Sequence, residues 1–561
     1  MQAPTEEPAQ GSAQDRRWSR AVLLLFAVVL LVLTKSEPLS WADASRLATI
    51  QALVENHGLA LHEDPRAASD EPSYLWQGDK VLIRGRYFSH QPPMMALLGA
   101  LPYAALHAAG RAIDAPGTYR ILTWVLVGLP LLAGLAALGR MMRRLGASDV
   151  QAAWLLAAAT FGTLALPYAL VLNQHGLAAG LVLLATEAVF LRRAALAGFL
   201  LALATTVDLT AVFFALALVI PLIWRTDDEP HFDFGALLAY GLAALPLLAL
   251  HFGINQAIAG DFKPLGLHTE AFEYPLSPFV LMNLTGGGDT GPAGTQLAYT
   301  RGALFGESGL FSLSPIQLLA LWFGCLAFLR RPSVRPLLLG ILVGSLGIVL
   351  FYLTSSRNFG GSSFGMRWFT VFAPLLLLPP AANTTRGFGP RPLFGLLLVW
   401  SVLFASLGAA QPWAKFHWRF EDSPEGMVAL PSDPRPGRLE FLADEWHRIR
   451  NLEEVFTETR MDALYQKLLD QHRKLYLRPL PGLSEEQRRA WITEGFVKLQ
   501  RAVNLLDDVN SKVASRPVGH FWLGKFHAAL GDLTAARREY ELTLTLAPSF
   551  AWAKKALDDL R

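Results

Sequence analysis

The sequence predicts an all-α polytopic membrane protein, in which a bundle of about eleven helices is followed by an α-helical extramembrane domain. Of its 561 residues, 52% are hydrophobic and only 17% charged, whereas a typical soluble domain has about 25% charged residues. Residues 21–34 contain no ionisable group, while the C-terminal region is dense in Arg, Glu, Asp and Lys. The net charge of +3 is too small to indicate a nucleic-acid partner. The single cysteine, Cys325, excludes disulfides within the chain and a cysteine-based metal site.

A helix that crosses a bilayer needs about 20 mostly apolar residues. The stretch 93–110 is also apolar, but its prolines and glycines favour a helix lying along a surface. The pair 194–206 and 208–224 is short and is interrupted at Asp208, which predicts two short helices meeting near one surface. The predicted spans are 18–34, 119–139, 150–168, 174–191, 194–206, 208–224, 234–256, 314–329, 335–354, 368–384 and 391–410.

Arginine clusters set the predicted orientation, because cytoplasmic loops of membrane proteins are rich in Lys and Arg. Arg16, Arg17 and Arg20 precede the first span and place residues 1–17 in the cytoplasm. If 93–110 does not cross, the later clusters are cytoplasmic too, and the C-terminal region lies outside. Reading 18–34 as a cleaved signal peptide would leave this sidedness unchanged. The outer segments are then 35–118, 257–313 and 355–367, and the cytoplasmic clusters are Arg140/Arg143/Arg144, Arg192/Arg193, Arg225, Arg330/Arg331/Arg335 and Arg386/Arg391.

The C-terminal region divides into a Pro-, Trp- and Gly-rich linker, 411–437, and a helical domain, 438–561. Within that domain, about 515–550 resembles a tetratricopeptide repeat, in which small residues let two helices pack closely around a tyrosine. A single repeat cannot bury its own face, so it would stack on the predicted helix 486–510 or on a protein partner. The residues that carry the resemblance are Leu523, Gly524, Gly531, Ala536, Tyr540 and Pro548.

The first outer loop begins with a short amphipathic helix from Ala44 to Val54, which has Leu47 and Ile50 on its apolar side. Asp43 stands at the start of this helix. A carboxylate there is favoured as a helix N-cap, which is the simplest interpretation of Asp43. A catalytic carboxylate is the alternative.

Four motifs that follow Asp43 in order together favour the catalytic interpretation. Asp43 follows the first span, and RLATIQALVE (46–55) and GRYFSHQPP (85–93) come next. LFGESGLFSLSPIQLLA (304–320) and NFGGSSFGMRWFTVFAPLLL (358–377) follow in order on the same predicted side. Over residues 18–410 the chain thereby resembles the GT-C superfamily of membrane glycosyltransferases, in particular bacterial relatives of the protein O-mannosyltransferases and of the aminoarabinose transferase that modifies lipid A.

The resemblance implies that a sugar is transferred from a polyprenyl-phosphate donor to a glycan, lipid or protein acceptor on the periplasmic side of a bacterial inner membrane. The phosphate leaving group activates the anomeric carbon, so the reaction chiefly needs a base for the acceptor hydroxyl, here Asp43. Cations near the outer surface would bind the carrier phosphate. Interfacial snorkelling is the alternative for such cations; we favour phosphate binding for Arg367 and leave Lys263 open. The most obvious outer basic residues are Lys263, Arg301, Arg357 and Arg367.

Three further polar residues lie near predicted span ends. Asp208 would orient an acceptor or help to bind a divalent cation, Mg²⁺ or Mn²⁺; the alternative is a turn residue in contact with water. His175 would contact a ligand or acceptor, and the alternative is hydrogen bonding at a helix end; Glu307 is a weaker candidate of the same kind.

The chain also departs from the pattern of the superfamily. Ala44 replaces the second acidic residue that many members have after the first, and Gln91 stands where many have a lysine before the double proline. Either other residues bind the phosphate in place of this lysine, or the donor differs. The candidates around this position are Arg84, Arg86, Tyr87 and His90, with Arg357 and Arg367 from the later loop.

Two other classes of protein remain open. One is a non-catalytic membrane scaffold on a GT-C-like frame, whose tetratricopeptide-like tail recruits a partner. The other is a transporter or flippase. The few charges within the spans and the lack of an inverted-repeat pattern argue against it.

Overall fold

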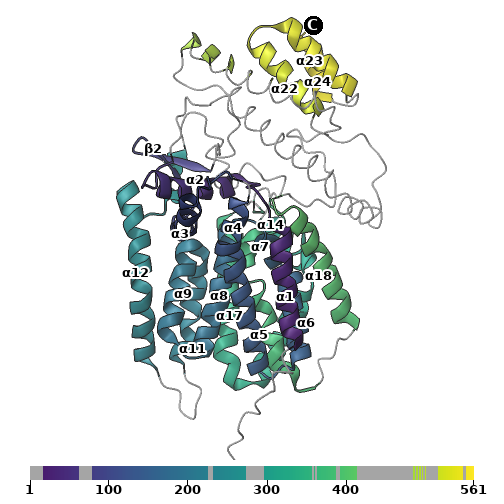
Figure 1. Ribbon diagram of the computed structural model, residues 1–561. Helices are drawn as coiled ribbons and strands as arrows, with labels where there is room; N and C mark the ends of the chain where they lie inside the picture. The colour runs from purple at the N-terminus through teal and green to yellow at the C-terminus, as the bar shows by residue number, and fades with distance from the viewer. Residues whose placement is uncertain are drawn as a thin grey trace, which may run out of the picture. The chain divides into compact units, whose positions relative to one another are not determined.

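The computed structural model describes two compact units. The first comprises residues 1–274 and 279–416, and the second comprises 275–278 and 417–561. The structure is mostly helical (Figure 1). The described residues are 17–61, 79–115, 117–224, 232–272, 296–356, 359–360, 363–386 and 392–413 of the first unit, and 484–486, 488–490, 492–493, 496, 500, 516–546 and 551–560 of the second.

The first unit is a bundle of apolar helices. Four helical stretches are long and apolar enough to cross a membrane: Thr118–Arg144, Phe234–Ala259, Pro332–Ser355 and Pro392–Ala410. A bent pair, Tyr299–Leu313 and Ile316–Arg330, would be a fifth. The helices of the bundle are α1 (Arg17–Leu33), α4 (Thr118–Thr123), α5 (Leu129–Arg144), α6 (Asp149–Phe161), α7 (Ala165–Ala169), α8 (Gln174–Phe190), α9 (Ala194–Val207), α10 (Val212–Ala217), α11 (Val219–Ile223), α12 (Phe234–Ala259), α14 (Gln296–Phe305), α15 (Leu310–Leu313), α16 (Ile316–Arg330), α17 (Arg335–Ser355) and α18 (Pro392–Ala410).

The exposed surface of α12 fits a membrane environment. Only 17% of its most apolar window is buried within the protein. Leu238, Leu242 and Leu245 are each more than half exposed, on a helix with no charged residue between Phe234 and Ala259. A continuous apolar surface of this kind is stable against lipid and unfavourable in water.

The chain between Arg367 and Arg386 differs from the prediction, which was one spanning helix at 368–384. It forms three 3-10 segments, η7 (Arg367–Val371), η8 (Leu375–Leu377) and η9 (Pro379–Arg386). Prolines at 374, 379 and 380 interrupt the stretch, since proline has no N–H to donate and disfavours an α-helical residue before it. Most of this stretch is buried in the protein, where irregular backbone is tolerated at membrane depth.

Arginine-rich turns lie together at one end of the bundle. The backbone N–H of Trp18 donates to the Asp149 carboxylate over 2.8 Å, and the Arg331 guanidinium donates to the Leu145 carbonyl over 2.8 Å. Arg140 forms an ion pair with Glu187 at 2.6 Å near the end of α8. The start of α1 and the ends of α5, α8 and α16 are therefore neighbours, at the end opposite α2 (Figure 1).

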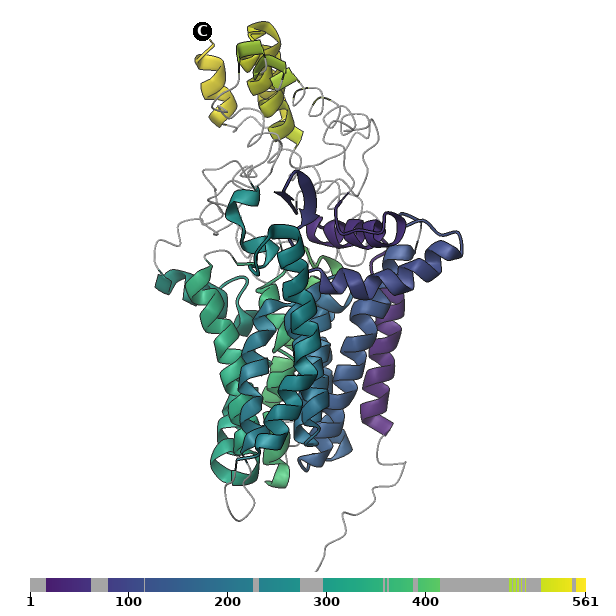
Figure 2. The same ribbon diagram turned by 90° about the vertical axis from the view of Figure 1, so that its left-hand side faces the viewer.

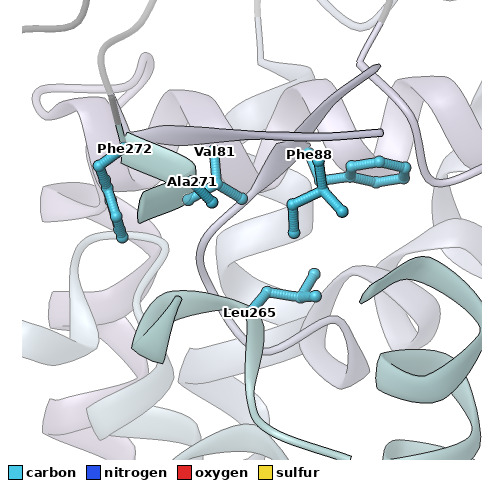
Figure 3. Close-up of a cluster of buried hydrophobic side chains, with 6 residues drawn as sticks. Val81, Phe88, Leu265, Ala271 and Phe272 are labelled. Carbon is cyan, nitrogen blue, oxygen red and sulfur yellow. The ribbon is translucent and has the colours of Figure 1, made fainter. Parts of the chain in front are cut away.

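Two short helices, α2 (Trp41–Glu55) and α3 (Met94–Ala108), pack against each other across the other end of the bundle (Figure 2). Leu47 and Ile50 of α2 are fully buried, in agreement with the predicted apolar side. A hairpin of β1 (Lys80–Ile83) and β2 (Arg86–Ser89) links the two helices in sequence. In the cluster of Figure 3, Val81 and Phe88 of the hairpin pack against Leu265, Ala271 and Phe272.

In the second unit, α22 (Arg516–Ala529) and α23 (Leu533–Leu546) form a helical hairpin, and α24 (Ala551–Asp558) follows. Gly524 lies against Tyr540: a Cβ at 524 would be 2.3 Å from the ring carbon Cε1. Gly531, with φ of 87°, makes the turn between the helices. The close approach that the sequence predicts is therefore present. Most of the predicted helical stretch 438–510 lies outside the described residues.

We expect Gly524→Leu to open this hairpin, because the added side chain cannot occupy the space of the Tyr540 ring. Limited proteolysis of the full-length protein in detergent should then cut within 516–546 at least about tenfold faster, which corresponds to roughly 1.4 kcal/mol in the opening equilibrium. Arg538→Leu on the exposed side of α23 is the matched control and should be cut like the parent chain. Equal cleavage of the two variants would contradict the packing role of Gly524.

Candidate functional site

Asp43 lies in the first turn of α2 and is not its N-cap, which corrects the simplest interpretation of this residue. Ser40 is the cap: its Oγ accepts the Asp43 N–H at 3.1 Å and donates to Asp43 Oδ1 at 2.9 Å. The acidic side chain thus bonds back to the hydroxyl of the capping residue. This exchange fixes the direction of the carboxylate at the start of the helix.

The second oxygen of Asp43 accepts from three donors, two of which are distant in sequence. Oδ2 accepts from the Tyr119 hydroxyl at 2.9 Å, from Trp413 Nε1 at 3.1 Å and from the Leu39 N–H at 3.4 Å. The side chain is fully buried. Burial raises the pKa of the Asp43 carboxyl above its usual range, although Arg46 and the hydrogen bonds favour the ionised form. Asp43 is therefore a desolvated carboxylate enclosed by donors.

Arg46, one turn along α2, is the nearest cation. Its Nη1 lies 3.8 Å from Asp43 Oδ1 and donates to the Leu172 carbonyl at 3.1 Å. Its Nη2 donates to the side-chain oxygens of Gln91, at 3.0 Å, and Gln174. Burial lowers the pKa of Arg46 to about 10. Sequence reasoning missed this residue, although its i,i+3 spacing from Asp43 on a predicted helix was the available signal.

His175 and Asp208 form a second polar pair, with Nδ1 and Oδ2 2.6 Å apart. Both side chains are buried, at 3% and 5% exposure, so the alternative of Asp208 as a turn residue in water is wrong. Asp208 Oδ1 accepts from the N–H and the hydroxyl of Thr210. Asn173 is the N-cap of α8, so His175 is not needed to cap the helix and its ring can bond to Asp208. Gln174, which binds Arg46, joins this pair to the Asp43 cluster.

Arg367 adjoins the same cluster from the start of η7. Its guanidinium carbon lies 5.1 Å from the centre of the Trp413 ring, and its buried Nε has no hydrogen-bond partner among the described residues. Trp413 was expected to lie in the linker 411–437. It belongs to the first unit instead and is 7% exposed, because the Pro412 carbonyl accepts from the Phe364 N–H at 3.0 Å.

Another predicted site residue, His90, adjoins this cluster through Gln91, which accepts from Arg46 Nη2. Arg86 and Lys263 are exposed, and their side chains form no ion pair with described residues. Tyr87 is half-buried and lies beneath the Lys80 ammonium. His90 lies 2.8 Å from the Gln91 amide, and burial lowers the pKa of its imidazole. Arg357 is outside the described residues.

A small depression lies beside Arg46. It encloses about 10 Å³, which is room for about one water molecule. Two of its apolar lining residues, Phe88 and Leu265, belong to the cluster of Figure 3. The polar lining residues are Arg46, Thr49, Ser89 and Gln91, and the apolar ones are Leu59, Phe88, Pro92, Pro93, Ala96, Ile258 and Leu265.

Comparisons with known proteins found no relative of this chain. No family model matches the chain, and no curated protein or solved structure is similar to it. Among the side chains that the structure describes, no group of three or more His, Cys, Asp or Glu residues is arranged to hold a metal ion.

Proposed function

We propose that the chain is a GT-C-type membrane glycosyltransferase, which transfers a sugar from a polyprenyl-phosphate donor to an acceptor outside the cytoplasm. One observation carries the proposal: Asp43, Arg46, Arg367 and the His175–Asp208 pair converge at one end of an apolar helical bundle. Buried ionisable groups cost free energy unless they are paired, so such a cluster at a bundle end favours a site for a polar reaction. Neighbouring apolar helices would hold the lipid part of the donor.

Arg46 and Arg367 would bind the donor phosphate. Arg46 lines the small depression described above, and the neutral groups Gln91 and Gln174 satisfy part of its guanidinium. Arg367 has a buried N–H without a hydrogen-bond partner. Charge-assisted hydrogen bonds from two guanidinium groups would stabilise the phosphate as the sugar leaves it. The predicted Mg²⁺ or Mn²⁺ ion stays a prediction.

Asp43 would serve as the general base. The acceptor oxygen forms a bond to the anomeric carbon while the bond from that carbon to the phosphate oxygen breaks. The electron pair leaves with the polyprenyl phosphate, and the acceptor proton passes to the Asp43 carboxylate. Burial raises the pKa of Asp43 and so makes it a stronger base than an exposed aspartate. The His175–Asp208 pair would orient the acceptor hydroxyl through the imidazole.

The proposed topology has eleven spans, a cytoplasmic N-terminus and a periplasmic helical tail. It is supported by the gathering of arginine-rich turns at the end opposite Asp43. A reporter active only outside the cytoplasm, fused after Arg561, should therefore be active. A silent fusion, together with an active cytoplasmic reporter at the same position, would contradict this topology.

Consumption of donor tests the proposed reaction. Purified protein in lipid nanodiscs would be incubated with a panel of polyprenyl-phosphate sugars, and released polyprenyl phosphate would be measured by mass spectrometry. Release that depends on the protein and on Asp43 would support the proposal. A lack of release with every donor and with mixed glycan, lipid and protein acceptors would overturn it.

The enclosure of Asp43 favours one other function, a non-catalytic scaffold. The carboxylate accepts hydrogen bonds from Ser40, Tyr119, Trp413 and Leu39, as expected of a structural residue. In that case the helical tail would recruit a protein partner. Partner capture that survives Asp43→Asn, with no donor release, would identify the scaffold.

A further inference from the structure

Trp413 touches both parts of the proposed machinery at once. Its indole N–H donates to Asp43 Oδ2 at 3.1 Å, and its ring lies 5.1 Å from the guanidinium carbon of Arg367. The indole is therefore in contact with the proposed base and with one proposed phosphate ligand. We propose that Trp413 is an autoinhibitory plug that imitates the substrates and must leave before they bind. This inference rests on the proposed function.

The indole N–H matches what an acceptor hydroxyl would present. An O–H that is to lose its proton to Asp43 must donate a hydrogen bond to the carboxylate before transfer. Ser40 already bonds Oδ1, and Tyr119 bonds Oδ2. Of the four donors, only Trp413 comes from outside the first loop and the helix that follows it. Removing Trp413 would therefore free an acceptor position on Oδ2 while the donors that orient the carboxylate remain.

The ring face of the same indole substitutes for an anion. A guanidinium over an aromatic face is attracted by the negative ring face, although more weakly than by a phosphate. The buried Nε of Arg367 is left without a hydrogen bond. An incoming phosphate would satisfy this N–H and replace the weaker contact, so phosphate binding and departure of the indole are coupled.

Trp413 follows α18 by three residues. The backbone beside it is held, since the Pro412 carbonyl accepts from the Phe364 N–H at 3.0 Å and from the Tyr168 hydroxyl at 3.2 Å, so the indole must leave by rotation of its side chain or by breaking these two bonds. The Tyr168 ring lies 5.9 Å from the indole. A short segment after a helix end can move without unfolding the helix, whereas Tyr119 lies inside α4 and is fixed by it.

Affinity for polyprenyl phosphate without a sugar tests the plug. A ligand that must displace the indole pays for that displacement, so Trp413→Ala should bind polyprenyl phosphate at least about tenfold more tightly than the parent chain. Trp413→Phe keeps a ring over Arg367 and loses the N–H, and we expect it to gain about threefold. Binding would be measured in nanodiscs. Weaker binding in both variants would make Trp413 a substrate-binding residue and overturn the plug.

Labelling of Asp43 by a water-soluble carbodiimide and an amine gives a readout that needs no donor. In the parent chain Asp43 is fully buried and should stay unlabelled. The exposed Asp114 should be labelled to the same extent in every sample, which shows that each sample received the same amount of active reagent. Trp413→Ala, and to a smaller extent Trp413→Phe, should raise labelling of Asp43. Unchanged labelling of folded variants would overturn the plug. If labelling of Asp43 increases but no variant binds polyprenyl phosphate, Trp413 covers Asp43 and the proposed donor is wrong.

Discussion

Asp43→Asn is expected to lower sugar transfer by at least about a hundredfold, the usual contribution of a general base. An asparagine amide cannot accept a proton at neutral pH. Its oxygen can still accept from Tyr119 and Trp413, and its NH₂ group can donate to the Ser40 Oγ that faces Oδ1. Folding and donor binding should therefore be largely retained. The measurement is the rate of donor consumption in single-turnover conditions.

Asp114→Asn is the matched control, because Asp114 is an exposed carboxylate in the same predicted outer loop. It should transfer sugar at the parent rate. Parent-like turnover in Asp43→Asn would rule out Asp43 as the base and direct the search to Asp208, with its partner His175. An unfolded Asp43→Asn variant would instead show that the carboxylate holds the bundle end together.

Local sequence predicted the elements that position Asp43. The spacing of Leu47 and Ile50 predicted a helix at 44–54, close to the observed α2. The interruption at Asp208 predicted a helix end at 206, and α9 ends at Val207. Both features depend on neighbours within a few residues, for which side-chain periodicity and a polar break are direct signals. The apolar composition likewise predicted a membrane protein.

The rest of the site depends on contacts that no local pattern records. Tyr119 and Trp413, which enclose Asp43, are 76 and 370 residues away in sequence. Trp413 follows a predicted span and lies in a Pro- and Trp-rich stretch, where a linker is the ordinary expectation. The apolar stretch 368–384 was predicted as an α-helix because hydrophobicity alone does not distinguish α from 3-10 geometry; its prolines were the missed signal.

Arg46→Gln is expected to weaken donor binding by about tenfold to a hundredfold, since hydrogen bonds to a charged group contribute roughly 1.5–3 kcal/mol. Arg46→Lys, the matched variant, keeps the charge and should lose less. Each Kd would be measured for polyprenyl phosphate in nanodiscs. A Kd that is unchanged in Arg46→Gln would exclude this residue from the phosphate site.

The pH dependence of Arg46→Gln separates this role from the effect of Arg46 on Asp43. Arg46 favours the ionised carboxylate and so lowers the pKa of Asp43, against the larger rise that burial causes. Because the base must be ionised, transfer should increase with pH through the pKa of Asp43. Removing the positive charge raises that pKa further, so the acid limb of the rate profile should move to higher pH in Arg46→Gln and stay near the parent position in Arg46→Lys. An acid limb at the same pH in all three proteins would mean that a group other than Asp43 accepts the proton.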